Sequence, residues 1–150
     1  MDGRISNPNG AYATGTATID GVDREIMEVL TTSALTVGDV VCWTTQATNT
    51  QPVVHISVQG TDDPASVAGV AVEVCAANRV AKICRGGPAL VNIAAGTVAA
   101  WERCILLAGT PGAADGVAAD ATTIVGDNWG VSLGAEIGTT NQAVADIRIG

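Results

Sequence analysis

The sequence is poor in large side chains. Its 150 residues include no phenylalanine, one tyrosine and three tryptophans, although 47% of them are hydrophobic. Most of the apolar content is therefore alanine, valine, isoleucine and leucine, which bury less area per residue than aromatic side chains do. The length suits one domain with a single core. We expect a chain of this composition to bury further surface by self-association.

Positive charge is also scarce. Lys82 is the only lysine, and the formal net charge is −8. Nucleic-acid binding needs clustered lysine and arginine, so we expect no nucleic-acid partner. Anionic membrane surfaces are disfavoured for the same reason, and no apolar run is long enough to span a bilayer. Met1–Arg4 is polar and no apolar stretch follows, so we expect synthesis in a cytoplasm, where thiols stay reduced.

Signatures of a reaction centre are missing as well. His55 is the only histidine, and nothing near it in the sequence supplies the partner and third group that an activated nucleophile needs. Gly86-Gly87 lacks the lysine and the following helix of a phosphate-binding loop. Glu73 and Glu136 occupy similar places in two repeated stretches, but solvated strand ends explain them more simply than a catalytic pair. We therefore expect no catalytic residue and no enzymatic activity.

Metal and cofactor motifs are absent too. Asp62-Asp63 and Asp127-Asn128 lack the alternating acidic loop of calcium sites and are interpreted as turn residues that bond nearby backbone amides. The cysteines contain no CxxC pair, so we expect free buried thiols, with no metal and no cofactor. The four cysteines are Cys42, Cys75, Cys84 and Cys104.

From Leu35 onward the pattern is that of β-structure. Short runs rich in valine, isoleucine and threonine alternate with turn signals, as in a sandwich or barrel, and the short connections favour antiparallel pairing. Proline cannot donate to a strand ladder, so we expect the prolines at strand ends or edges. The predicted strands are Val40–Thr44, Val53–Val58, Val67–Glu73, Arg79–Arg85, Leu90–Ile93, Val98–Leu107, Ile124–Val125, Gly130–Leu133 and Ala143–Ile149. The predicted turns include Gly86-Gly87-Pro88 and Asp115-Gly116.

Two stretches, Gly38–Gly86 and Gly96–Gly150, repeat each other. Gly38 and Trp43 recur as Gly96 and Trp101, and Gly69 recurs as Gly130. Two copies are too few for a solenoid. The repeat predicts an all-β fold, a small pseudo-duplicated antiparallel β-barrel in which each half covers the apolar face of the other.

Residues 1–35 differ from the rest and are interpreted as an extended N-terminal arm, with residues 36–150 as the β-barrel domain. Ser6–Gly10 is a turn cluster. Tyr12–Ile19 is an expected extended segment that can add to another sheet. Asp20–Leu30 fits either a short helix capped by Asp20 or a short strand.

Several of these features resemble the capsid decoration (cement) proteins of tailed bacteriophages, of the β-tulip-like kind. The resemblance spans roughly residues 35–150. It is carried by short motifs: Gly38–Val41, Val67–Glu73, the Arg85-Gly86-Gly87 turn with Pro88 and the strand at Val91, Ala95-Gly96, and Gly130–Leu133.

The resemblance implies a structural virion protein without catalytic residues. It further implies a homotrimer that binds the major capsid protein at threefold sites of the capsid exterior and stabilises the shell. An N-terminal arm would reach neighbouring subunits. Trp43 and Trp101 are expected to occupy one equivalent place in each half, as either core or interface anchors. The candidate capsid- or subunit-binding residues are Ile5, Pro8, Tyr12, Ile19, Ile26, Trp43 and Trp101.

Two other readings stay open. A cytoplasmic β-clip domain that binds a ligand or acts as an enzyme would show a pocket with convergent polar groups. A receptor-binding tip of a phage fibre would also be a trimer, but would expose aromatic loops.

Overall fold

Ten β-strands and one 3-10 helix form the regular part of the computed structural model, which describes residues 12–19, 22–44, 52–58, 61–93, 99–106, 110–117, 129–135, 137 and 140–149. All strands belong to one sheet, and the described residues contain no α-helix, so the all-β prediction is confirmed. The elements are β1 (Tyr12–Ile19), β2 (Val22–Thr31), β3 (Val40–Trp43), β4 (Val53–Ile56), η1 (Pro64–Ser66), β5 (Val67–Ala71), β6 (Arg79–Asn92), β7 (Arg103–Leu106), β8 (Ala114–Val117), β9 (Gly130–Ser132) and β10 (Gln142–Arg148).

The first half of the chain forms a closed circuit of hydrogen-bonded strands. β2 pairs with β4 in parallel, and the circuit continues through the antiparallel pairs β4–β3, β3–β5 and β5–β6. β6 then returns to β2 as its antiparallel partner. Each strand of this circuit therefore has a neighbour on both sides.

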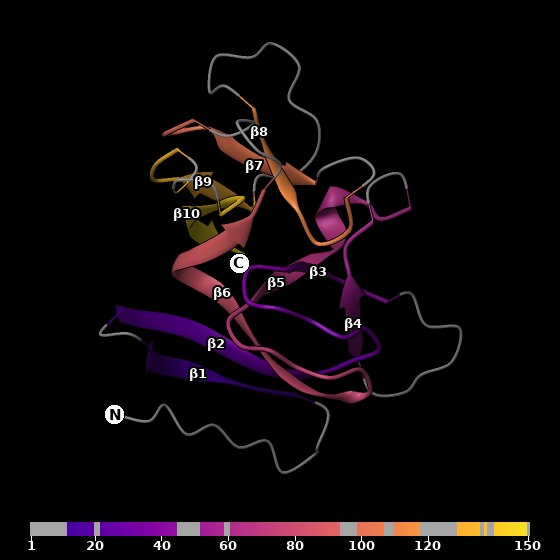
Figure 1. Cartoon of the computed structure of the whole chain (residues 1–150). Helices are drawn as coiled ribbons and strands as arrows, with labels where there is room; N and C mark the ends of the chain where they lie inside the picture. Colours follow the sequence, from indigo (N-terminus) through magenta and orange to yellow (C-terminus); the bar gives the residue numbers. More distant parts are fainter. Residues whose placement is uncertain are drawn as a thin grey trace.

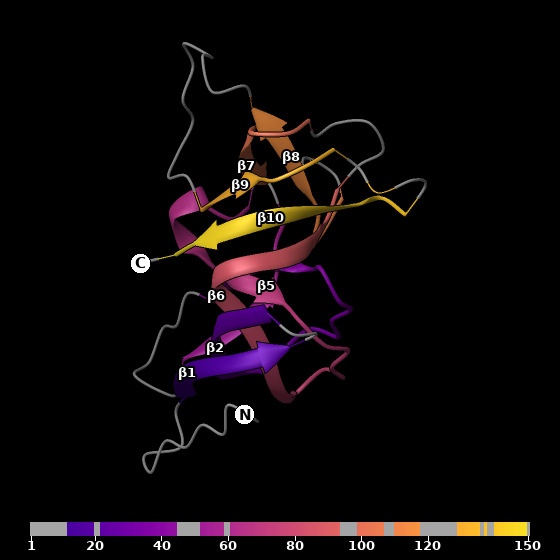
Figure 2. The same ribbon diagram turned by 90° about the vertical axis from the view of Figure 1, so that its left-hand side faces the viewer.

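The second half repeats the same order of pairing. β6 pairs antiparallel with β10, and the antiparallel pairs β10–β9, β9–β7 and β7–β8 follow. A parallel bridge between Ile93, next to the end of β6, and Ala114 of β8 closes this circuit. In both views β1 and β2 lie at one end of the molecule and β7 and β8 at the other, with β6 curving between them (Figures 1 and 2).

The order of strand pairing recurs in the two halves, but the predicted register between Trp43 and Trp101 is wrong. Val54 pairs in parallel with Thr31 in the first circuit, and Ala114 pairs in parallel with Ile93 in the second. Val54 and Ala114 therefore occupy equivalent places in the two circuits. Their antiparallel partners are Trp43 and Leu106. Trp43 therefore corresponds to Leu106, and Trp101 precedes β7. The glycine-to-tryptophan spacing matched by coincidence, because the two stretches run along different parts of the fold.

The predicted match between Gly69 and Gly130 is confirmed. The residue after Gly69 lies opposite Val40, the first residue of β3, and the residue after Gly130 lies opposite Arg103, the first residue of β7. A Cβ atom on Gly69 would stand 2.7 Å from the carbonyl oxygen of Cys84, so the close approach of β5 and β6 requires glycine there.

Two apolar clusters fill the molecule. One cluster lies within the first circuit and includes Met27, Val41 and Ile83. The other contains residues of both halves, among them Val70 from β5 and Ile147 from β10. Each half thus buries apolar surface of the other, as the repeat predicts.

At two pairs of equivalent positions, the two circuits differ in which one carries the larger side chain. The registers place Ala68 of β5 in correspondence with Trp129, just before β9, and Ile83 in correspondence with Ala145. Trp129 is only 3% exposed and packs in the cluster shared by both halves. A large residue therefore replaces a small one at one position and the reverse occurs at another, which keeps a similar backbone frame close-packed.

β6 runs without interruption through Gly86-Gly87-Pro88, where the sequence predicted a turn. Pro88 lies opposite Asp146 of β10, and the pairing of β6 with β2 ends at Gly86. The missing N–H of Pro88 is accommodated because β6 has already left its β2 partner. The prediction of a second turn at Asp115-Gly116 is also wrong, since both residues lie in β8.

Residues 22–35 belong to the folded core, which corrects the predicted arm of residues 1–35. β2 pairs with both β4 and β6, so it is part of the first circuit. The strand alternative for residues 20–30 is confirmed over Val22 onward and the helix is wrong, because sheet partners on both sides outweigh a weak helical pattern. Residues of this segment in the core are Ile26, Met27, Val29 and Leu35.

Tyr12–Ile19 form β1, an extended strand as expected, and residues 1–11 lie outside the described part of the chain. β1 pairs with β2 over its whole length and is the first strand in the order of the sheet.

Replacing Trp129 with alanine should lower the free energy of unfolding by about 3–5 kcal/mol, because it empties the shared cluster. Trp101→Ala is the matched control, since the same side chain is removed from a position that is 67% exposed. We expect that variant to lose less than about 0.5 kcal/mol. Urea unfolding followed by circular dichroism measures both, and equal losses would contradict the assignment of Trp129 to the core.

Candidate interaction surface

The structure separates the candidate binding residues into different environments. Ile26 is 1% exposed, so its side chain is a core residue and cannot contact a capsid, which corrects that assignment. Trp43 is half-buried against the cluster of the first circuit. Tyr12 and Ile19 are the end residues of β1, and Ile5 and Pro8 lie outside the described residues. Of these predicted candidates, Trp101 is the one whose large apolar side chain is shown to be exposed to solvent, at 67%.

Trp101 lies on a turn that is fixed by hydrogen bonds involving Ser132 and Glu102. Its own N–H donates to the carbonyl oxygen of Ser132, at 2.8 Å. Glu102 Oε2 accepts from Ala99 N–H at 2.7 Å, and Glu102 N–H donates to Ser132 Oγ at 3.0 Å. The Ser132 hydroxyl in turn donates to the carbonyl oxygen of Ala99. Because Ser132 is fully buried, the turn is anchored to the interior of the second circuit.

The backbone of Trp101 is in the left-handed region, with φ of 67°. An L-residue with a bulky side chain adopts this conformation at a cost of the order of 1–3 kcal/mol. The turn bonds therefore compel a conformation that glycine would adopt more easily.

The first half does have glycine at this place. Gly38 has φ of 97°, and its N–H donates to the carbonyl oxygen of Ala71 just as Trp101 donates to Ser132. Asp39 follows Gly38 and accepts from a backbone N–H three residues earlier, as Glu102 does. Trp101 thus corresponds to Gly38, 63 residues earlier in the sequence.

Two more exposed apolar residues follow β9 in the chain. Leu133 directly follows Ser132 and donates its N–H to Val144, and Ile137 donates its N–H to Gln142. Their exposures are 40% and 45%. We call Trp101, Leu133 and Ile137 the Trp101 surface. Scattered exposed apolar residues are normal, but a tryptophan held out on an anchored turn is typical of a binding contact.

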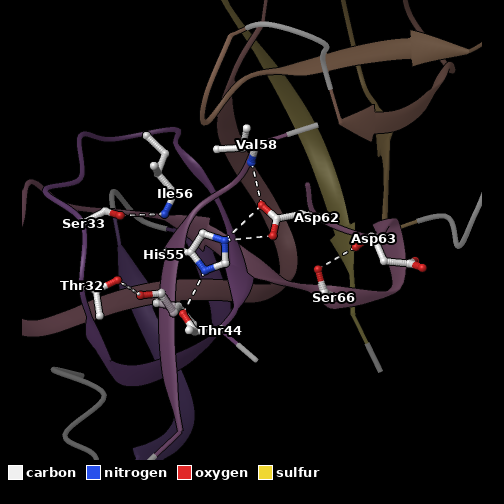
Figure 3. A network of polar contacts seen from close by, with 10 residues as sticks. Thr32, Ser33, Thr44, His55, Ile56, Val58, Asp62, Asp63 and Ser66 are labelled. Atoms are coloured by element: carbon white, nitrogen blue, oxygen red, sulfur yellow. Dashed lines mark hydrogen bonds and ion pairs between the residues drawn. The ribbon is translucent and has the colours of Figure 1, made fainter. Parts of the chain in front are cut away.

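His55 has partners that the sequence did not reveal. Its Nε2 lies 2.9 Å from Asp62 Oδ1, and its Nδ1 lies 2.9 Å from Thr44 Oγ1. Asp62 also accepts from Val58 N–H at 2.7 Å, as Figure 3 shows. A hydroxyl, an imidazole and a carboxylate therefore stand in a row. The sequence indicated no local partner for His55, whereas the structure brings Asp62, seven residues later, within hydrogen-bond distance of it.

This row fastens the segment after β4 onto β3 and β4. Asp62 is buried, and its carboxylate accepts from both a ring nitrogen and a backbone amide. Asp63 accepts from Ala65 N–H, so the interpretation of both aspartates as turn residues is confirmed. These hydrogen bonds have a structural role, since each partner satisfies a polar group that would otherwise be left without a hydrogen bond.

All four cysteines are free and buried, as predicted. Burial raises the pKa of the Cys104 thiol to about 12 and the pKa values of Cys42 and Cys84 to about 11. Burial likewise raises the pKa of Cys75. These thiols stay protonated at neutral pH and are weak nucleophiles.

Other candidate groups do not converge. Glu73 lies at the surface with Lys82 Nζ 3.8 Å away, and Glu136 is outside the described residues. Within the described ranges, no three side chains of His, Cys, Asp or Glu gather as a metal site requires. The described part of the chain also contains no helix with the length and apolarity needed to cross a membrane.

Comparisons with protein-family models, with curated proteins and with solved structures gave no match.

Stability should fall as the pH rises above about 9. The unfolded thiols ionise near their ordinary pKa of 9.0, whereas the folded Cys104 thiol keeps its proton until about pH 12. Above pH 9 the unfolded state therefore binds fewer protons, and its free energy falls relative to the folded state. Cys104 alone should contribute about 1 kcal/mol of this loss at pH 10. Urea midpoints at pH 8 and pH 10 measure it, with Cys104→Val as the control that declines less. An identical decline in both proteins would contradict the burial of this thiol.

Proposed function

We propose that the protein is a structural virion protein that attaches to the outside of a bacteriophage capsid and stabilises the shell. It acts as a homotrimer at threefold sites, and its partner is the major capsid protein. The observation that carries the proposal is Trp101, which is exposed and held in a left-handed conformation where the other half of the chain has Gly38. Strain that persists at an exposed position is typical of a residue kept for contact.

The composition supports attachment by shape rather than by charge. The chain has a net charge of −8 and a single lysine, so attraction to acidic surfaces is weak. Tryptophan is the side chain most often found at the energetic centre of a protein interface. We place the Trp101 surface against the capsid or against a neighbouring subunit of the trimer. Trimeric attachment multiplies weak single contacts into firm binding.

In this proposal the two strand circuits are the two halves of a pseudo-duplicated β-barrel of the β-tulip-like kind. The support is the repeated order of pairing, with one parallel and several antiparallel contacts in each half. The proposed arm keeps Ile5 and Pro8 as contact residues, and β1 and β2 are excluded from it because both are strands of the sheet. The arm is thus shorter than the 35 residues that the sequence alone predicted.

A second candidate function is a receptor-binding tip of a phage fibre. The exposed aromatic side chain of Trp101 on a turn is the observation that favours it. Such a tip would bind the surface of the host cell and leave the capsid bare.

Replacing Trp101 with glycine tests the proposal without harming the fold. Glycine adopts the left-handed conformation freely, so the variant should keep its free energy of unfolding or gain about 1 kcal/mol. Its attachment to capsid shells should weaken about 100-fold, the loss expected for a central interface tryptophan. Cosedimentation with shells of the phage's own major capsid protein measures this, and urea unfolding checks the fold.

His55→Gln is the control, because His55 bonds Asp62 and is not part of the Trp101 surface. We expect it to attach as the unaltered protein does. Unchanged attachment of the Trp101→Gly variant would remove Trp101 from the contact. Failure of the unaltered protein to bind shells, together with binding to host cells, would favour the fibre tip.

A further inference from the structure

Strand β1 is a long outer edge of the sheet. It stands first in the strand order, and each of its eight residues has a partner in β2, from Tyr12 opposite Val29 to Ile19 opposite Val22. The ladder between the two strands has no bulge. In Figures 1 and 2, β1 is the outermost strand at the end away from β7 and β8.

Within Tyr12–Ile19, the edge strand itself carries no charge, proline or bulge that would discourage pairing with another chain. Tyr12–Ile19 contains no charged residue and no proline, whereas β2 beside it has Asp23, Arg24, Glu25 and Glu28. Proteins that keep an edge strand solvent-exposed normally shorten it, bulge it, or place lysine or proline on it. A regular, uncharged edge of this length is a template for one more strand.

The sequence of β1 fits a copy of itself. Ala13-Thr14-Gly15-Thr16-Ala17 reads the same in both directions. If two β1 strands run antiparallel about a twofold axis at Gly15, Ala13 of each lies opposite Ala17 of the other, and Thr14 lies opposite Thr16. A twofold interface requires this self-complementarity, since every contact occurs twice. Opposed threonines are a favourable cross-strand pair.

We propose that β1 is an interface between two copies of this chain, paired antiparallel about Gly15. The main-chain hydrogen bonds of the pair continue the sheet of one copy into the sheet of the other. This contact depends only on β1 and is independent of capsid attachment. Combined with a trimer, it gives a hexamer or links neighbouring trimers.

The test uses two variants with opposite charge. Ala13→Lys with Ala17→Lys sets lysine opposite lysine across the twofold axis, and Ala13→Glu with Ala17→Glu sets glutamate opposite glutamate. Within its own chain, position 13 lies opposite Glu28 and position 17 opposite Arg24. Each variant thus gains one favourable and one unfavourable pair with β2, so their effects on the hairpin are balanced.

The full-length protein should contain an even number of copies of the 15.0 kDa chain by light scattering. Each variant alone should weaken the twofold contact at least about tenfold, because like charges oppose each other twice. An equimolar mixture of the two variants should restore the original mass. A third variant, Ala13→Lys with Ala17→Glu, should associate by itself.

A damaged fold would not be repaired by mixing, so the mixture separates loss of the contact from loss of structure. A monomer or a lone trimer for the unaltered protein would overturn the proposal, and a lone trimer would leave the proposed capsid function intact. Lysine variants that keep the original mass, or a mixture that stays dissociated, would overturn it as well. In those cases the edge is covered by another segment or by a strand of the capsid protein.

Discussion

The fold depends on one strand, β6, being shared by both halves. Its first part closes the first circuit on β2, and its last part opens the second circuit on β10. Neither circuit can close if β6 is broken, so the two halves are expected to unfold together. The strand therefore explains why the repeat is a single domain rather than two that are loosely joined.

Polar side chains reinforce the point where the halves meet. Asn92, the last residue of β6, donates to Asp39 Oδ1 at 2.7 Å and accepts from Gln142 Nε2 at 2.9 Å. Gln142 also donates to the carbonyl oxygen of Val37. Asp39 is buried, and the hydrogen bonds that its carboxylate accepts from Asn92 and Thr36 offset its lost hydration. The turn at Gly38 is tied to β10 of the other half in this way.

The two halves share a backbone plan and differ in their side chains. Trp129 fills the second circuit where the first has Ala68, and the difference is absorbed by smaller residues nearby. Trp101 and Gly38 also correspond, but here the larger side chain points to solvent rather than into a core. The first difference serves packing, and the second has no packing role. We therefore propose Trp101 as a contact residue, because the halves diverge there without a packing reason.

The sequence predicted the β class, most strands and the fact of a duplication, because valine-rich runs between turn residues are a local signal. It did not predict the register of the repeat, since the spacing of Gly38 and Trp43 recurs by chance in a different part of the fold. Pro88 and its two glycines indicated a turn, and only the loss of the β2 partner at Gly86 lets them lie within a strand.

The candidate site was predictable only in part. Trp101 was recognised as informative from its size, but its exposure and left-handed backbone depend on bonds to Ser132, 31 residues later in the sequence. Ile26 was misassigned because the arm was taken to end at residue 35, whereas β2 has partners on both sides. The pairing of His55 with Asp62 was missed, because the two residues are seven apart in the sequence and no motif joins them.

Amide hydrogen exchange along β6 distinguishes one strand shared by both circuits from two strands joined by a turn. If β6 is one strand shared by two circuits, the amides from Ala81 to Val91, including Gly86 and Gly87, should exchange only on global unfolding. They should then respond together to added denaturant. Fast exchange at Gly86 and Gly87, with slow exchange on either side, would mean that a turn separates two independent halves and would contradict the account.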